Sequence, residues 1–519
     1  MHANRREFLT AMLGASALPV VGTGADSRAL LHFVSHAELA SDPRRPQYHL
    51  LPPANWMNDP NAPIYWNGSY HMFYQYNPNA AIWGDMHWGH AVSPDMVHWH
   101  HLPVALAPTP GGPDAEGCFT GTAAVEDGRV VILYTGVRKA SPEEATIKDA
   151  TPPLRESQCL ATASDPDLKS WIKTPAPVIA APPELQVNGF RDPSPWRQGD
   201  AWYLAAACGI PDAGGAVLLY RSTQPNDLRN WEYMHMLSRR DRAGDAAFNP
   251  FDPWEVWECP EFFALGDWHV LIFSTAGKTC WQSGKLDEKT MDFHVEHAGT
   301  VDYGSFYAAK TQFDKSGNRI LWGWIPESRP VAEYSAAGWA GMMSLPRVLL
   351  VDGAGRLRLE FASEIVQLRG RQQSLNVTAD ESSIQRQIES MRLPACCGEI
   401  RCTARSGAGP FELNLAGEDA DEAAWMVIEY DPRHANQISV DGRPLSLSLS
   451  EGEPLQLHAY VDGSVIELLV NNTIAWTKRF YPAGKIAHDL RIRWRGSSAA
   501  LTSLDVWQLS PISNDRLTT

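Results

Sequence analysis

The sequence contains no apolar run long enough to span a membrane. A bilayer-crossing helix needs about 20 predominantly apolar residues, and the weakly apolar run over residues 11–21 is much shorter. An excess of positive charge is also missing, because 44 Lys and Arg residues face 60 Asp and Glu residues, for a net charge of -16 at pH 7. This balance argues against nucleic acid and anionic membranes as partners. We therefore expect neither nucleic-acid binding nor membrane insertion.

Cysteine is scarce and shows no metal-ligand spacing. The chain has 8 Cys residues, without a CxxC motif. Cysteine side chains that bind no metal are usually buried as small apolar groups, and we expect most of these to lie in the core. A disulfide from Cys402 to Cys396 or Cys397 remains open as an alternative.

Residues 1–30 have the features of an export signal rather than of a folded element. Arg5 and Arg6 precede the short apolar run over residues 11–21, and small residues around Ala25 suit a cleavage site. A twin-arginine pair in this position resembles a Tat signal. We therefore expect export, with a periplasmic or extracellular location.

Helical periodicity is rare between residues 48 and 350, and short strand-like runs dominate instead. Five runs share one layout, in which a polar start and a strand are followed by a tight turn and an aromatic-rich strand. The turns centre on Asn67-Gly68, Asp127-Gly128, Gly199-Asp200, Gly266-Asp267 and Ser316-Gly317. Regular repetition of a hairpin unit predicts a five-bladed β-propeller over residues 46–350. A large β-sandwich is the alternative.

The character of the chain changes after about residue 360, where the Trp-rich repeats stop and short turn-bounded strands continue. An Asp-Gly turn at residues 462–463 joins two of these strands, and residues 378–390 are either a loop or a short helix. This part is long enough for a separate sandwich. The predicted fold class is therefore all-β, with a five-bladed propeller followed by a C-terminal β-sandwich over residues 365–515.

Three carboxylates lie in unusual local sequences at the starts of repeats. Asp59 lies in WMNDPN and Asp192 in FRDP, each directly before a proline, and Glu258 lies in the apolar and aromatic WECP. Because equivalent starts of propeller blades face the central channel, we expect the three to converge. Retaining glycosidases use one carboxylate as nucleophile and another as acid and base. The 20 Trp residues also favour a sugar site, because an indole face stacks on sugar rings.

The motifs WMNDPN, FRDP and WECP, in this order, resemble glycoside hydrolase family 32, the invertase, inulinase and levanase family. The similarity continues in residues 74–106, CFTG, YGSFYAAKT and GWAGMMSLPR, and covers roughly residues 46–510. It implies a retaining enzyme with Asp59 as nucleophile, Asp192 as transition-state stabiliser and Glu258 as acid/base. The side chains that it implies for the fructosyl pocket are Trp56, Asn58, Gln75, Trp83, Phe119, Thr120, Arg191 and Trp339.

The sequence departs from the family pattern at Ala62, Thr120 and Glu261, where Gly, Ser and Asp are usual. None of these changes removes a carboxylate of the three. The resemblance also implies chemistry without a metal or cofactor, so the histidines at 98, 100 and 101 are interpreted as part of a strand.

The expected reaction is hydrolysis of terminal non-reducing β-D-fructofuranoside bonds, with sucrose as the favoured substrate. Exo-inulinase or levanase activity and fructosyl transfer are the nearest alternatives. A five-bladed arabinan- or xylan-active hydrolase and a non-catalytic sugar-binding protein are more distant alternatives. The intact set of Asp59, Asp192 and Glu258 argues against the last of these.

Overall fold

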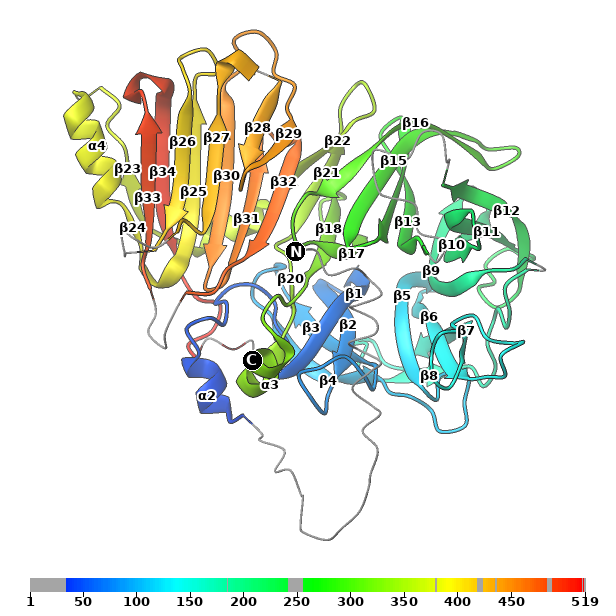
Figure 1. The fold of residues 1–519 in the computed structure, drawn as a ribbon. Helices are drawn as coiled ribbons and strands as arrows, with labels where there is room; N and C mark the ends of the chain where they lie inside the picture. The colour runs from blue at the N-terminus through cyan, green and yellow to red at the C-terminus, as the bar shows by residue number, and fades with distance from the viewer. Residues whose placement is uncertain are drawn as a thin grey trace.

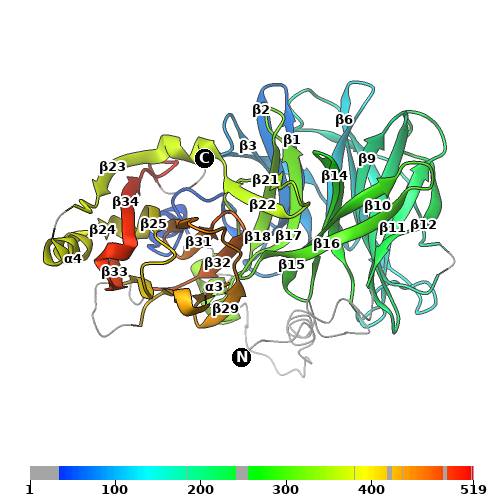
Figure 2. The ribbon, with the colours of Figure 1, turned by 90° about the horizontal axis from the view of Figure 1, so that it is seen from above.

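The structure is a computed structural model that describes residues 34–515 and 517, apart from 184, 241–254, 379, 418–422, 435 and 483–487. The expected export signal over residues 1–30 lies outside the described residues. Within the described part, no helix is long and apolar enough to cross a membrane. Figures 1 and 2 show two regions built of strands, which lie side by side.

The described part of the N-terminal region contains five small sheets that follow one another along the chain and are antiparallel apart from one short parallel pairing. The first has β1 (Asn55–Trp66), β2 (Ser69–Asn77), β3 (His87–Ser93) and β4 (His100–Leu106), with β19 (Trp339–Ala340) parallel to β1. The second has β5 (Gly117–Glu126), β6 (Arg129–Lys139), β7 (Leu154–Ala163) and β8 (Trp171–Lys173). The third has β9 (Asn188–Gln198), β10 (Ala201–Ile210), β11 (Gly214–Ser222) and β12 (Trp231–Arg239).

The fourth sheet has β13 (Glu258–Leu265), β14 (Trp268–Thr275), β15 (Lys278–Asp287) and β16 (Asp292–Asp302). The fifth has β17 (Tyr307–Phe313), β18 (Arg319–Ile325), β20 (Met342–Met343), β21 (Arg347–Val351) and β22 (Leu357–Phe361). The last sheet therefore continues past residue 350, where the sequence predicted the end of the propeller.

The five sheets are arranged around a common centre. The inner strands β1, β5, β9, β13 and β17 contact one another in a closed circle, because β1 lies beside both β5 and β17. A separate hydrophobic cluster fills each of the interfaces between neighbouring sheets. This is the radial arrangement of a β-propeller, in which burial of apolar side chains between sheets holds the circle closed.

The predicted hairpin turns are confirmed at the inner pair of each sheet. The Asn67-Gly68 turn joins β1 to β2, and both of its residues have a positive φ, of 48° and 83°. Asp127 and Gly128 join β5 to β6 with φ values of 46° and 75°. These angles are those of hairpin turns that match the twist of the strands, which explains why Asn-Gly and Asp-Gly marked the repeats.

The C-terminal region consists of two six-stranded sheets packed face to face over one hydrophobic core. One sheet has the order β23 (Arg369–Ser374), β34 (Leu501–Leu509), β25 (Cys397–Ala404), β30 (Leu455–Asp462), β31 (Val465–Val470), β32 (Ile474–Arg479). The other has the order β24 (Arg392–Leu393), β33 (Leu490–Gly496), β26 (Phe411–Ala416), β27 (Met426–Tyr430), β28 (Gln437–Val440), β29 (Arg443–Ser446). The expected β-sandwich is present.

Helices are short in the described part of the chain. They are α2 (His36–Ser41), α3 (Val331–Ala337), α4 (Glu381–Ser390), and the 3-10 turns Ser363–Leu368, Pro394–Cys396, Pro432–His434 and Ser498–Ala500. Of the two alternatives for residues 378–390, the structure shows the helix, α4. Asp380 caps its N-terminus, and Ile384 and Ile388, one turn apart, are buried against the sandwich.

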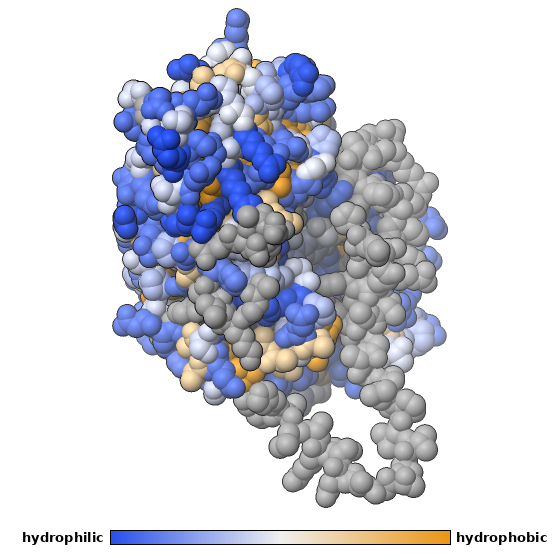
Figure 3. All heavy atoms as spheres, turned by 60° about the vertical axis from the view of Figure 1, so that its left-hand side comes forward, coloured by the Kyte–Doolittle hydropathy of each residue, from blue (hydrophilic) through white to orange (hydrophobic). Residues whose placement is uncertain are grey.

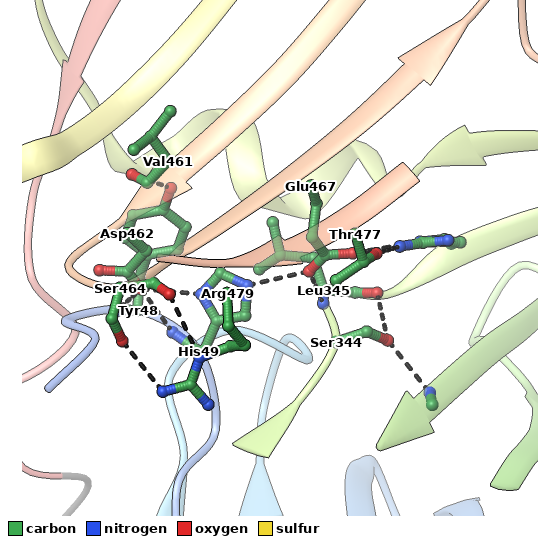
Figure 4. A network of polar contacts seen from close by, with 12 residues as sticks. Tyr48, His49, Ser344, Leu345, Val461, Asp462, Ser464, Glu467, Thr477 and Arg479 are labelled. Atoms are coloured by element: carbon green, nitrogen blue, oxygen red, sulfur yellow. Dashed lines mark hydrogen bonds and ion pairs between the residues drawn. The ribbon is translucent and has the colours of Figure 1, made fainter. Parts of the chain in front are cut away.

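A buried polar network joins the two regions (Figure 4). His49, in the segment before β1, contacts Asp462 Oδ2 at 2.8 Å through Nδ1 and Glu467 Oε1 at 2.9 Å through Nε2. Arg347 on β21 bonds to Glu467 and, at 2.8 Å, to Asp302 at the end of β16. Asp462 and Glu467 belong to the sandwich, so the network fixes the sandwich against the first, fourth and fifth sheets.

All 8 cysteines are buried, and none forms a disulfide. The predicted burial is therefore confirmed, and the alternative disulfide from Cys402 to Cys396 or Cys397 is absent. Seven of them lie on strands, and Cys396 lies in the 3-10 turn Pro394–Cys396. Outside the core, Figure 3 shows mostly hydrophilic residues on the described part of one face of the molecule, with small scattered hydrophobic areas.

Candidate active site

Each inner strand of the propeller has a β-bulge at the corresponding position. At each bulge, two or more residues of the inner strand lie opposite a smaller number of residues in the neighbouring strand. The breaks in register lie between Met57 and Pro60, Phe119 and Gly121, Arg191 and Ser194, Glu258 and Glu261, and Tyr307 and Lys310. A bulge turns side chains out of the usual alternation. Here it directs the side chains of the inner strands towards the centre of the circle.

Three prolines mark these bulges in the sequence. Pro193 and Pro260 lie within a break in register, where a residue without an N–H removes no ladder hydrogen bond, and Pro60 is the first residue after such a break. Asp192 and Cys259 precede two of them and have positive φ values of 59° and 51°. Such backbone is uncommon for residues other than glycine and is often found at functional sites.

Asp59 on β1 is held by donors from two sheets. Asn58 Nδ2 donates to its Oδ1 at 2.9 Å, and Thr120 Oγ1 on β5 donates to its Oδ2 at 2.6 Å. Gln75 Nε2 in turn donates to Thr120 Oγ1 at 2.9 Å, and Trp56 Nε1 donates to Asn58 Oδ1 at 2.7 Å. These bonds fix the orientation of the carboxylate and link four predicted pocket residues to it.

The pKa of Asp59 is raised above its usual value, mainly by burial. The hydrogen bonds from Thr120 and Asn58 oppose this effect, and the nearby negative charge of Glu258 adds to it. The two hydrogen bonds therefore stabilise the ionised form, which is the form that can act as a nucleophile.

Glu258 at the start of β13 is held from the sheets on both sides. Arg191 Nη1 on β9 donates to its Oε1 at 3.1 Å, and the Tyr307 hydroxyl on β17 donates to its Oε2 at 2.5 Å. Arg191 is itself fixed by an ion pair with the buried Glu156, at 2.5 Å between Nε and Oε1. Residues at the same position of three successive inner strands thus form one chain of contacts.

Asp192 is buried and contacts Cys259, which also lies beside Asp59 and directly follows Glu258. The backbone N–H of Cys259 donates to Asp192 Oδ2 at 2.8 Å, and the Cys259 Sγ lies 3.7 Å from Asp59 Oδ2. Burial raises the pKa of Asp192 to about 7, although Arg191 and Lys310 lower it. The structure therefore brings the three predicted carboxylates together around one residue.

Aromatic side chains form a cluster beside the carboxylates. Trp83 and Phe119 meet edge to face with centroids 6.0 Å apart, and Trp56 lies 5.9 Å from Trp324 and 6.0 Å from Tyr334. Trp56, Trp83 and Phe119, which the sequence predicted for the pocket, thus belong to one aromatic cluster. The cluster also includes Met86, Ala340, Ile82 and Tyr307.

Trp339 is the one predicted pocket residue that the structure places elsewhere. Its side chain is fully buried, and its indole N–H donates to Asp42 Oδ2 at 2.8 Å. Arg329 lies over its ring at 4.5 Å, and Arg45 and Arg479 lie 5.5 Å and 5.7 Å from the ring centroid. The contacts of Trp339 are thus those of a core residue near the sandwich, although its short strand β19 pairs with the inner edge of β1, opposite β2.

Several residues of the site had not been identified in the sequence. Tyr307 lies in the quoted YGSFYAAKT motif, and its position at the start of the fifth repeat, equivalent to Arg191 and Glu258, was the available signal. Glu156 and Tyr334 lie on β7 and α3, outside the starts of the repeats, and no pattern in the sequence pointed to them.

The arrangement provides two carboxyl groups in different settings, with a third beside them. Asp59 accepts bonds from neutral donors, whereas Glu258 contacts a cation and a phenol. Such a pair suits nucleophilic attack by one group and proton transfer by the other. Among the described residues, no group of three or more His, Cys, Asp or Glu side chains is arranged to hold a metal ion.

Comparisons with known proteins identify the family. Residues 49–360 match the glycosyl hydrolases family 32 N-terminal domain, and residues 364–508 match the family 32 C-terminal domain. A sucrose-6-phosphate hydrolase of Escherichia coli is 33% identical over 490 residues, which cover 89% of this chain and 94% of that protein. A raffinose invertase of Escherichia coli is 33% identical over 486 residues, covering 90% and 95%.

Solved structures agree with these matches. A family 32 β-fructofuranosidase of Bombyx mori superposes with a TM-score of 0.72 at 27% identity, covering 92% of this chain and 96% of that one. A fructan 1-exohydrolase of Cichorium intybus gives a TM-score of 0.73 at 26% identity, covering 90% and 98%. Together with the carboxylates around Cys259, these matches establish that the chain belongs to glycoside hydrolase family 32.

Proposed function

We propose that the protein hydrolyses terminal non-reducing β-D-fructofuranoside bonds with retention of configuration, and that sucrose is its favoured substrate. The observation that carries this proposal is the convergence of Asp59, Asp192 and Glu258 around Cys259 in a family 32 chain. A relative named raffinose invertase and a solved β-fructofuranosidase support the substrate class.

In the first half of the reaction, Asp59 attacks the anomeric carbon of the fructosyl group and forms a covalent ester. The glycosidic C–O bond breaks, and Glu258 gives its proton to the departing oxygen, which leaves as glucose when the substrate is sucrose. The hydrogen bonds from Asn58 and Thr120 hold Asp59 in one orientation before the attack, and such positioning lowers the barrier.

In the second half, ionised Glu258 takes a proton from water while the water oxygen attacks the anomeric carbon and releases Asp59. Arg191 and Tyr307 bond to the two oxygens of Glu258 and keep it aligned through both steps. Positive charge develops on the sugar ring in each transition state, and we assign its stabilisation to the carboxylate of Asp192.

A substrate panel tests the proposal. Purified protein is given sucrose, sucrose 6-phosphate, raffinose, inulin and levan, and the products are separated and quantified. We expect release of fructose with the highest kcat/KM on sucrose, and NMR should show β-fructofuranose as the first anomer. A preference for sucrose 6-phosphate, which is named for one of the relatives, or for inulin or levan would overturn the substrate choice, and an inverted first anomer would overturn the mechanism.

Fructosyl transfer uses the same covalent intermediate with a sugar hydroxyl in place of water. Predominant trisaccharide formation in concentrated sucrose would contradict hydrolysis as the main activity. Cleavage of aryl arabinosides with none of sucrose would favour the arabinan-active alternative. A non-catalytic sugar-binding role would leave all substrates of the panel uncleaved.

We also propose that the five sheets are five blades, and that the propeller and sandwich domains meet after β22, in the part of the predicted interval 350–365 that follows Phe361. The supporting observation is that β22 ends at Phe361 and β23 begins at Arg369. Because β32 and the polar network of His49 bury a shared interface, deletion of the chain after residue 362 should leave the propeller insoluble. A soluble, active fragment would contradict this division of roles.

We propose export through the twin-arginine route, with residues 1–30 as the signal. The supporting feature is the pair Arg5-Arg6 before a short apolar run. Replacement of both by Lys should abolish export of a fused reporter in a bacterial host with a Tat system. Unchanged export of the Lys-Lys version would contradict the route.

A further inference from the structure

A buried ion pair lies in the central channel next to the three carboxylates. Lys310 on β17 and Glu261 on β13 are 0% and 4% exposed, and Lys310 Nζ lies 3.0 Å from Glu261 Oε1. Each residue is the first one back in register after the bulge of its strand. The pair therefore follows directly after the residues that form the site.

Glu261 accepts hydrogen bonds from inner strands of several sheets. Thr122 on β5 donates to it at 3.3 Å, and Ser194 on β9 at 3.0 Å. Thr311 on β17 donates through its amide at 3.2 Å and its hydroxyl at 2.8 Å. Lys310 also bonds to Thr122 at 2.9 Å. The pair thus connects four of the five sheets at the channel, which a solvated ion pair would not do.

The charges around the site are unbalanced. Among the described residues, the cations Arg191, Lys310 and Arg319 face five carboxyl groups, which are Asp59, Glu156, Asp192, Glu258 and Glu261. Arg191 already forms ion pairs with Glu156 and Glu258. The groups whose charges act on Asp192 are Arg191, Glu258 and Lys310, with the Cys259 amide bonded to it.

Burial and Glu258 raise the pKa of Asp192, whereas Arg191, the hydrogen bond from the Cys259 amide and Lys310 lower it. In its assigned role, Asp192 must be ionised when positive charge forms on the sugar. A group that holds Asp192 ionised would therefore contribute to the low-pH limit of activity, together with the groups that hold Asp59 ionised.

We propose that Lys310 and Glu261 form a positioning pair, in which Lys310 keeps Asp192 ionised during turnover and Glu261 fixes Lys310 in the channel. Neither side chain touches the substrate. The inference rests on the proposed function, because it assigns a need for ionised Asp192 to a fructoside hydrolase.

The pH dependence of kcat/KM on sucrose tests this pair with variants of opposite sign. Lys310→Met removes the cation and should move the acid limb to higher pH by at most about one unit, because an opposite charge that acts on Asp192 is lost. Glu261→Gln leaves Lys310 unopposed, and should move the limb to lower pH. Lys310→Arg keeps the charge and should retain a limb close to that of the wild type.

Lys173→Met is the matched control, because Lys173 also pairs with a buried carboxylate, Asp114, but in the second sheet away from the site. Its acid limb should stay at the wild-type pH. A merely structural role for the channel pair would lower kcat without shifts of opposite sign, and would overturn the proposal. If Lys310→Met does not fold, Glu261→Gln alone decides, since an unshifted or raised limb contradicts it. A wild-type protein that cleaves no fructoside would instead refute the proposed function.

Discussion

His49 is predicted to make the docking of the sandwich dependent on pH. It is fully buried between Asp462 and Glu467, and hydrogen bonds to both raise its pKa from 6.5 to about 9, against the opposing effect of burial. Arg347 and Asp302 complete the charges around it, and the Tyr48 hydroxyl lies nearby, bonded to Val461 O. The imidazolium is therefore the form that joins the two regions.

The direction of this pH dependence follows from the raised pKa of His49. Protonated His49 stabilises the folded state fully below its unfolded pKa of 6.5, and this stabilisation is lost as the pH rises through about 9. At 1.36 kcal/mol per pKa unit, the shift corresponds to about 3 kcal/mol.

The assay compares urea unfolding of the wild type and of His49→Gln on either side of this range. The free energy of unfolding lost in His49→Gln should be larger by about 3 kcal/mol below pH 6.5 than above pH 9. His98→Gln is the control, since His98 pairs with Asp95 at the surface and its side chain is 38% exposed. An equal loss for His49→Gln at both pH values would refute the reasoning.

Three further predictions concern single side chains. Tyr307→Phe removes a donor to Glu258 and should lower kcat/KM on sucrose by about tenfold to a hundredfold, the value of a hydrogen bond to a charged group; an unchanged steady-state rate would contradict its assigned role. Thr120→Val removes a donor to Asp59 and should cause a loss of the same order, whereas Thr120→Ser should keep most of the activity. Trp339→Phe should lower the free energy of unfolding by about 1–3 kcal/mol with little change of KM for sucrose; a large rise in KM would show that Trp339 contacts the substrate.

The repeats and the three carboxylates could be predicted from the sequence because they depend on residues that are adjacent in the chain. Asn-Gly and Asp-Gly set the hairpin turns through their tolerance of positive φ. The prolines after Asp59 and Asp192 lie at the end of one break in the strand ladder and within another, so the same local signal marked the bulges and the catalytic candidates.

The remaining features depend on how the circle of sheets closes. Tyr307 reaches Glu258, and Lys310 reaches Glu261 and Thr122, only because inner strands far apart in the sequence meet at the channel. Trp339 is a residue that the sequence motif identified but whose surroundings the motif did not predict. Its motif matched the family, but its position on the short β19 beside the buried arginines is set by tertiary packing.

The central claim is that Asp59 forms a covalent bond to the fructosyl group and that Glu258 completes the cycle. The most direct measurement is mass spectrometry of acid-quenched Glu258→Gln incubated with sucrose or with a fructoside that has an activated leaving group. We predict an added mass of one fructosyl group on the peptide that contains Asp59, and none in Glu258→Gln/Asp59→Asn. A label on another residue, or turnover by Asp59→Asn at the wild-type rate, would contradict the account.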